Sequence, residues 1–220
     1  MYMPKYHALT DVGAMHTHID HHPLGAWVCT LDNGLVANHI PFFLDKSCAP
    51  FGQLIGHVSR ANPVWRQLAE GVTSVVMFMG PQAYITPVWY PGKRAHGKVV
   101  PTWNYVTVHA HGVMRAIEDP DWILSMLRRL TDAQESSRHN PWQVTDAPAM
   151  YVQQMLRAIV GIELTIDRLE GRLKVSQDEE PADRLGTVEG LMHEPDTQAQ
   201  AIASLVRREM KIEDSAGNAQ

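Results

Sequence analysis

The chain has 220 residues, of which 45% are hydrophobic, and a net charge of −5 at neutral pH, so it can fill a sizeable globular core. The negative charge argues against a protein whose main surface is a nucleic-acid footprint, and no apolar run reaches the length of a membrane-spanning helix. With two cysteines, Cys29 and Cys48, and an N-terminus without the pattern of a secretory signal, we expect a cytoplasmic protein with reduced thiols.

A short helix is expected near the N-terminus, because Thr10 or Asp11 can cap it and apolar residues follow four apart. It carries the string HTHIDH, which begins at His16 and matches the HxHxDH metal string of the metallo-β-lactamase superfamily. In a helix, His16 and His18 point to nearly opposite faces and cannot hold one ion together. We therefore expect a solvated, histidine-rich helix and no metal site, and the role of the cluster up to His22 stays open.

Two apolar runs, 24–31 and 35–44, are expected to pair as antiparallel strands, since Asn33-Gly34 between them favours a tight turn. Asn38 and His39 are unusual residues for the centre of a sheet. This stretch is therefore either an irregular strand end or a place where a ligand replaces a neighbouring strand.

A possible anion site follows the next strand. Ser59 and Arg60 come after its last apolar residue, and Asn62 and Pro63 are suited to begin a helix that ends at Gly71. The N–H groups and the dipole at a helix N-terminus suit a phosphate, and Ser59 and Arg60 would add a hydroxyl and a guanidinium. The alternative is an ordinary capped helix with a solvated arginine, and spacing alone does not decide between them.

The middle of the chain predicts further strands. Residues 74–79 are fully apolar and predict a strand that is buried on both faces. Gly80-Pro81 then predicts a turn before another strand at 83–86, and residues 91–100 lack periodicity and predict a loop.

A long strand is predicted after this loop. Trp103 and Tyr105 are two residues apart and share one face of it, while Asn104 faces the other way. The ring pair belongs either to the core or to an exposed platform for a planar ligand. His109 and His111 also share a face, but two strand histidines alone are a weak indication of a metal site.

Helices and one more strand complete the chain. Asp119 caps an amphipathic helix, another helix follows Pro148 and ends at Gly161, and a strand is predicted from Ile162 toward Leu173. From residue 177 the chain is acidic and then forms an amphipathic helix, which we expect to pack on the body or on a partner subunit. We expect its last residues, from 214, to be frayed.

Together these elements predict a mainly β, α+β fold, an antiparallel barrel with peripheral helices and a helical C-terminal tail. The strands do not alternate regularly with helices, so a doubly wound α/β sheet fits less well. We expect one domain over residues 1–176 and a helical C-terminal extension over 177–220.

Two sequence strings are distinctive in combination: Pro-Thr-Trp-Asn-Tyr at 101–105 and Gly-Pro-Gln-Ala-Tyr-Ile at 80–85. Further matching segments lie at 1–6, 38–42, 56–63, 89–90, 108–109, 174–177, 183–184 and 190–191. These segments, spread over residues 1 to about 192, resemble the PaiB-type proteins, described as FMN-binding negative transcriptional regulators, of the FMN-binding split-barrel superfamily. One departure is the pair Asp178-Glu179, where the family pattern has asparagine and often a basic residue, and it puts an anion contact from that turn in doubt.

The resemblance implies a six-stranded split barrel that forms a homodimer with FMN at the subunit interface. It implies a phosphate site at Ser59, Arg60 and Asn62, with His57 close by. It also implies flavin contacts from a further set of residues, some of them in the partner subunit: Asn38, His39, Trp103, Asn104, Tyr105, Lys174 and Gln177. An isoalloxazine ring needs a flat apolar cradle and a few fixed donors, and its phosphate needs cations and N–H groups.

The resemblance leaves the activity open. One hypothesis is a flavin-dependent or flavin-sensing transcriptional regulator, although the chain is acidic and shows no helix-turn-helix with a basic recognition helix. Another is an oxidoreductase similar to flavin reductases or pyridoxamine-phosphate oxidase, in which the flavin carries the chemistry. A third, haem binding or breakdown, is compatible with the many histidines.

Overall fold

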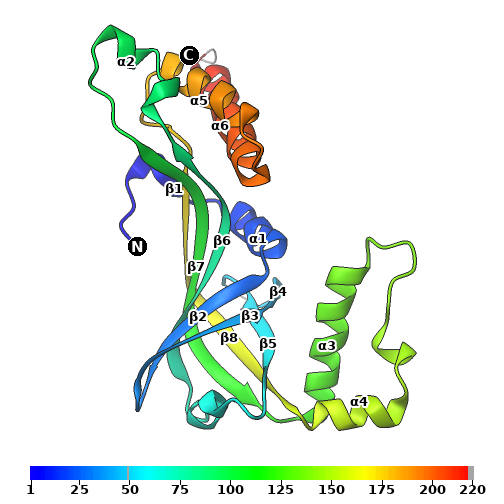
Figure 1. Cartoon of the computed structure of the whole chain (residues 1–220). Coiled ribbons are helices and arrows are strands. Elements are labelled where there is room, and N and C mark those ends of the chain that lie inside the picture. Colours follow the sequence, from blue (N-terminus) through cyan, green and yellow to red (C-terminus); the bar gives the residue numbers. More distant parts are fainter. Residues whose placement is uncertain (49, 218–220) are drawn as a thin grey trace. The chain divides into compact units, whose positions relative to one another are not determined.

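The computed structural model describes residues 1–48 and 50–217, with side chains as far as residue 211 (Figure 1). The strands are β1 (Ala8–Leu9), β2 (Leu24–Leu31), β3 (Gly34–Pro41), β4 (Phe43–Asp45), β5 (Gln53–Ser59), β6 (Val72–Ile85), β7 (Thr102–Ile117) and β8 (Ile159–Lys174). The α-helices are α1 (Val12–His21), α2 (Gly92–Ala95), α3 (Pro120–Glu135), α4 (Ala149–Leu156), α5 (Pro181–His193) and α6 (Thr197–Gly217). Short 3₁₀ helices are η1 (Lys5–His7), η2 (Pro63–Gln67), η3 (Pro87–Trp89) and η4 (Val144–Asp146). None of the described helices is both long and apolar enough to cross a membrane.

The strands form one sheet in the order β3-β2-β6-β7-β8-β5-β4, with β1 paired to β8. Within the described residues, six of the eight strands have seven residues or more, whereas β1 has two and β4 has three. The path of hydrogen-bonded strands ends at β3 and β4 and is not closed. The predicted mainly β, α+β fold is confirmed. The predicted run 35–44 is divided into β3 and β4, and β1 was not predicted.

The chain divides into two compact units, which are described separately. The terminal unit contains Met1–Thr10, Met79–Thr107 and Gly171–Gln220, and the central unit contains Asp11–Phe78 and Val108–Glu170. Strands β6, β7 and β8 each contribute residues to both units.

In the central unit, β2 and β3 form the predicted hairpin. They pair from Leu24↔Pro41 to Leu31↔Gly34, which leaves two residues in the turn. Gly34 has a φ of 104°, which a residue with a side chain rarely adopts, so glycine is needed at this turn. Trp27 of β2 is fully buried, and its indole N–H donates to the hydroxyl of Ser74 on β6 at 3.0 Å.

Helices cover other parts of the central unit. The carboxylate of Asp11 accepts the backbone N–H of Ala14 at the start of α1, so the predicted first helix is confirmed. Asp119 caps α3 in the same way, by accepting the N–H of Asp121 at 2.9 Å. Ile123 of α3 is buried in a cluster with Ile55 of β5, and this apolar contact holds α3 on the sheet.

The terminal unit is built around the helices α5 and α6, which lie side by side (Figure 1). Their apolar residues share a core with the ends of the strands: Ile85, Val175, Leu191, Ile202 and Val206. Gly186 allows close approach, because a Cβ there would lie 2.1 Å from the carbonyl oxygen of Trp89. The expected helical extension at 177–220 thus packs within this unit, and its status as a separate domain stays a prediction.

Several predicted boundaries are wrong. Gly80-Pro81 is not a turn but lies inside the single strand β6, because proline and the residue before it adopt extended backbone as readily as a turn. Residues of β6 also alternate between buried and exposed, so 74–79 is not buried on both faces.

The helix predicted to run from Pro63 to Gly71 is only the 3₁₀ helix η2. Residues 91–100 include the short helix α2, and Gly161 lies within β8 rather than at the end of a helix. Helix α6 runs to Gly217, beyond the expected fraying at 214, and residues 218–220 lie outside the described residues.

Candidate functional site

The predicted cofactor residues fall into one group in each unit. The central unit holds Asn38, His39, His57, Ser59, Arg60 and Asn62. The terminal unit holds Trp103, Asn104, Tyr105, Lys174 and Gln177.

In the central unit, side chains link β3 to the turn after β5. The amide of Asn62 donates to Oδ1 of Asn38 at 2.9 Å, and its own Oδ1 accepts the N–H of Val64, so Asn62 is the predicted cap. Gly56 of β5 lies close to β3, because a Cβ there would meet the carbonyl oxygen of Pro41 at 3.1 Å. The two polar stretches that the sequence singled out are therefore neighbours.

His57 is the residue of this group with an unmet hydrogen-bonding need. Its Nδ1 is buried and has no hydrogen-bond partner among the described residues. Burial lowers the pKa of His57, so its ring is neutral at neutral pH. A buried nitrogen without a partner is costly, and a ligand that supplies the missing hydrogen bond would relieve this cost.

Arg60 is held by protein groups at all three nitrogens of its guanidinium. Nε donates to the carbonyl of Arg157 at 3.0 Å, Nη2 to the carbonyl of Ile159 at 3.2 Å, and Nη1 to Glu118 at 2.7 Å. The guanidinium also lies 5.3 Å from the ring centre of Trp65. Arg60 therefore links the end of β5 to the start of β8. The guanidinium could contact a phosphate, as predicted, only if at least one of these three hydrogen bonds were broken.

The helix that was expected to add a dipole at this place is the five-residue 3₁₀ helix η2. Such a helix has too few aligned peptide groups to form a strong anion site. Ser59 is exposed, and its hydroxyl accepts the N–H of Ala61 at 3.3 Å. His39 is exposed on the end strand β3.

In the terminal unit, aromatic side chains gather on adjacent strands. Trp103 of β7 is 53% exposed, and its ring meets that of Tyr84 on β6 edge to face, with 5.9 Å between the centroids. Tyr105 is half-buried, and the guanidinium of Arg172 on β8 lies 5.3 Å from its ring centre. We call Tyr84, Trp103, Tyr105 and Arg172 the aromatic face. Trp103 is therefore not part of the core, and its role as a platform for a planar ligand stays a prediction.

The residues behind this face hold a tight turn. Asn104 is fully buried and donates to the hydroxyl of Ser176 at 2.8 Å, while its Oδ1 has no partner among the described residues. Ser176 has a φ of 63°, a conformation that costs free energy in a residue with a side chain. The amide of Gln177 donates to the carbonyl of Leu173 at 2.6 Å and accepts the N–H of Val175 at 2.8 Å. Asn104 and Gln177 therefore stabilise the turn.

Cations also lie near this turn. The ammonium of Lys174 donates to the hydroxyl of Thr102 at 2.5 Å. Arg172, two residues earlier on β8, donates Nη1 to the carbonyl of Tyr2, and its Nε is buried without a partner among the described residues. The sequence reasoning missed Arg172, although its position two residues before Lys174 places both side chains on one face of β8.

A groove of about 540 Å³ borders Tyr84, Trp89 and Trp103. Its volume is in the range of small-molecule sites. Its flat aromatic side chains suit the ring system of FMN. The acidic residues Glu194 and Asp196 also line the groove and do not suit a phosphate, so we expect only the ring system to lie there.

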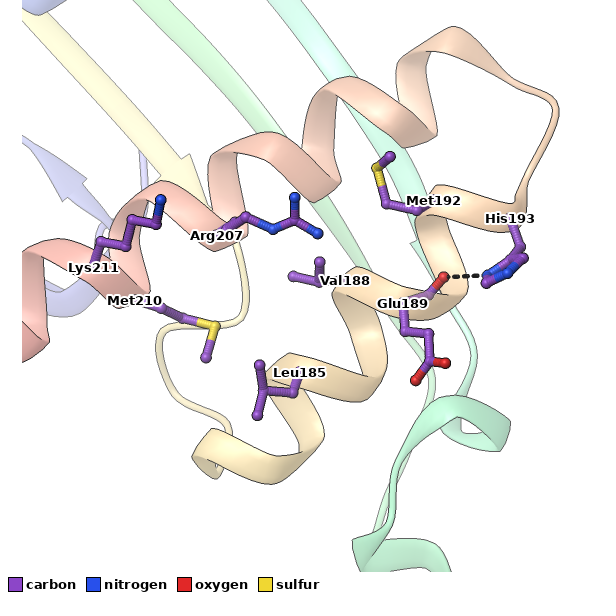
Figure 2. A pocket seen from close by; sticks show the side chains of 8 residues that line it. All are labelled: Leu185, Val188, Glu189, Met192, His193, Arg207, Met210 and Lys211. Carbon is purple, nitrogen blue, oxygen red and sulfur yellow. Dashed lines mark hydrogen bonds between the residues drawn. The ribbon is translucent and has the colours of Figure 1, made fainter.

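A second hollow, of about 590 Å³, lies between α5 and α6 (Figure 2). Figure 2 shows Leu185, Val188 and Met192 of α5 near Met210 and Arg207 of α6. Its lining contains no Phe, Tyr or Trp and none of the predicted cofactor residues, so it is not the candidate flavin site.

Comparison with known proteins agrees with this chemistry. Residues 1–168 match the model of a family described as "Putative FMN-binding domain". The chain is 32% identical to an uncharacterized protein of Emericella nidulans, over 97% of this chain and 99% of the relative. It is 28% identical to the protease synthase and sporulation protein PAI 2 of Bacillus subtilis, over 96% and 99%.

A solved structure, the FAD and heme binding protein from Mycobacterium smegmatis, has a TM-score of 0.56 at 21% identity, over 76% of this chain and 72% of that one. This likeness shows a shared fold. The match to the family model covers most of the chain, and the chain therefore belongs to the family described as "Putative FMN-binding domain", with FMN as its cofactor.

Proposed function

We propose that the protein is a homodimer that holds FMN at its subunit interface and acts as a flavin-responsive regulator of the PaiB type. The observation that carries this proposal is that Trp103, which is 53% exposed, and Tyr84 meet edge to face on a groove of about 540 Å³, where flat rings can stack on a planar ring system. The similarity to PAI 2 of Bacillus subtilis over nearly the whole of both chains supports a shared role.

The flavin contacts would come from both subunits. We assign the ring system to the aromatic face of one subunit, where Trp103 and Tyr105 offer a flat apolar surface. We assign the polar edge of the flavin to the partner's central unit, where Asn38, His57 and Asn62 lie, with His39 and Ser59 exposed. We assign the phosphate to the same unit, where Arg60 would reach it by exchanging its contact with Glu118. The unpaired Nδ1 of His57 supports this assignment.

Bound FMN would supply one-electron and hydride chemistry, while the protein residues bind and orient it. Lys174 and Arg172 would offer positive charge on β8. Asn104 and Gln177 would fix the turn that carries Lys174, because both side chains hydrogen-bond within it. We also propose a cytoplasmic location, since Cys29 and Cys48 are not joined in a disulfide.

A second candidate function is a flavin-dependent oxidoreductase. The net charge of −5 favours the oxidoreductase, because direct DNA binding by a regulator needs a positively charged surface. Trp103 is 53% exposed, and a flavin stacked on its ring would keep its own other face open to a second planar substrate.

One experiment separates the two functions. The FMN-loaded protein is mixed with NADH or NADPH, and flavin bleaching and reoxidation are followed by absorbance. In parallel, retention of promoter DNA is measured for the oxidised and the reduced protein at several salt concentrations. We expect salt-sensitive retention that differs between the two flavin states, without sustained nicotinamide oxidation. Steady turnover with no DNA retention in either state would contradict the regulator and establish the oxidoreductase.

A further inference from the structure

A cluster of potential metal ligands lies on β7 and β8 in the central unit. His109 and His111, two residues apart on β7, meet Glu170 of β8. One ligand atom from each of the three side chains lies within 4.8 Å of the other two, and Nε2 of His111 is 3.1 Å from the carboxylate of Glu170. None of these residues is used by the flavin site proposed above.

The residue types of this cluster suit a metal ion, because two imidazoles and one carboxylate come together on neighbouring strands. Neutral imidazoles and an ionised carboxylate are the forms that bind metal.

The distances are also close to those of a metal site. Zinc binds imidazole nitrogen and carboxylate oxygen at about 2.0–2.2 Å, so two ligand atoms on one ion are at most about 4.2 Å apart. His111 and Glu170 already satisfy this limit. The whole set lies within 4.8 Å, so side-chain rotations that bring the ligand atoms up to about 1.4 Å closer would give the spacing of about 3.4 Å between ligands of a tetrahedral zinc ion.

We propose that His109, His111 and Glu170 form a binding site for a divalent transition-metal ion, with the remaining coordination positions open to water or a ligand. Two histidines and one carboxylate form a set that suits Zn²⁺, Fe²⁺ and related ions. Arg168 forms an ion pair with Glu170 and competes with the metal for this carboxylate.

The histidine-rich helix α1 is a poorer candidate, although its sequence matches a metal-binding string. Nε2 of His16 bonds to the carbonyl oxygen of Phe51 at 2.8 Å, and Nε2 of His18 bonds to that of Phe78 at 3.0 Å. These two rings are held by different parts of the backbone and do not converge. His21 and His22, at the C-terminal end of α1, offer a control for nonspecific metal binding.

The test is a titration of the full-length, FMN-loaded protein with Co²⁺ and, in competition with a chromogenic chelator, with Zn²⁺. We expect one ion per chain and visible cobalt absorption bands that Zn²⁺ abolishes. His109→Ala and His111→Ala should each weaken Zn²⁺ binding at least tenfold, and the double variant His21→Ala/His22→Ala should bind as the parent does. Arg168→Gln should bind Zn²⁺ more tightly, because it removes the competing cation.

The fold and the FMN content of each variant are checked by circular dichroism and by flavin absorbance. If His109→Ala does not fold, His111→Gln and Glu170→Gln take its place, because both keep the size of the side chain. Zn²⁺ affinity unchanged in the ligand variants, or lost in the His21/His22 variant instead, would overturn the proposal. Failure to bind FMN would contradict the proposed function but leave this metal titration interpretable, since the two sites share no residue.

Discussion

Replacement of Arg60 by alanine separates an anchoring role from a role in phosphate binding. The change removes two hydrogen bonds to backbone carbonyls, those of Arg157 and Ile159, and one ion pair with Glu118. Hydrogen bonds from charged groups contribute about 1.5–3 kcal/mol when buried, and an exposed ion pair contributes about 0–1 kcal/mol. Because the Arg60 side chain is 36% exposed, we take the lower end and expect a loss of about 2–3 kcal/mol in the free energy of unfolding.

The assay is urea unfolding of the FMN-free protein, together with the dissociation constant for FMN measured by flavin fluorescence. We expect Arg60→Ala to lower the unfolding midpoint, while Arg60→Lys recovers only part of it because lysine lacks the planar set of donors. The control is Arg138→Ala, because Arg138 is exposed and its ion pair within the described part of the chain is with Glu135, three residues earlier; we expect a change below about 0.5 kcal/mol. An unchanged midpoint with FMN affinity reduced tenfold or more would refute the anchoring role and identify Arg60 as a phosphate ligand.

Three further predictions concern stability. Gly112→Ala places a Cβ 2.0 Å from the carbonyl oxygen of Thr165, so we expect a loss of about 3 kcal/mol or failure to fold, seen by thermal unfolding. Asp119→Ala removes the cap of α3 and should cost about 1 kcal/mol in urea unfolding, while Asp119→Ser should recover most of it; equal stability of all three proteins would contradict the capping role. Burial lowers the pKa of His18 to about 4, so its contribution to stability is complete above pH 6.5 and is lost as the pH falls from 6.5 toward 4, by about 3 kcal/mol. His18→Gln keeps a donor for the carbonyl of Phe78 but does not titrate, so it should flatten this part of the stability profile, and a profile like that of the parent would contradict the assignment.

Local signals in the sequence predicted many elements because their physical cause is local. Asn33-Gly34 predicted the hairpin between β2 and β3, since the turn needs a glycine with positive φ. Asp119 predicted the start of α3, since its side chain accepts an N–H two residues away. Gly80-Pro81 was misread because the same dipeptide is compatible with turn and strand, and the burial pattern of β6 shows the difference only in the folded chain.

The candidate site was less predictable because its contacts join distant parts of the sequence. Arg60 looked like a free cation, but its partners Glu118 and Ile159 follow 58 and 99 residues later. Alternation along β7 placed Trp103 and Tyr105 on one face, but it could not say whether that face is covered. Glu170 joins the histidines of β7 only through the sheet, so the metal cluster was not visible in the sequence.

The most direct test of the flavin account is titration of the parent protein, Trp103→Ala and Trp142→Ala with FMN, followed by flavin fluorescence. Trp142 is a matched control, because it is 48% exposed and lies outside the aromatic face. Aromatic stacking contributes about 1–3 kcal/mol, so we expect Trp103→Ala to weaken FMN binding roughly tenfold or more and Trp142→Ala to leave it unchanged. Equal FMN affinity in all three proteins would show that the flavin does not lie on the face formed by Trp103 and Tyr105.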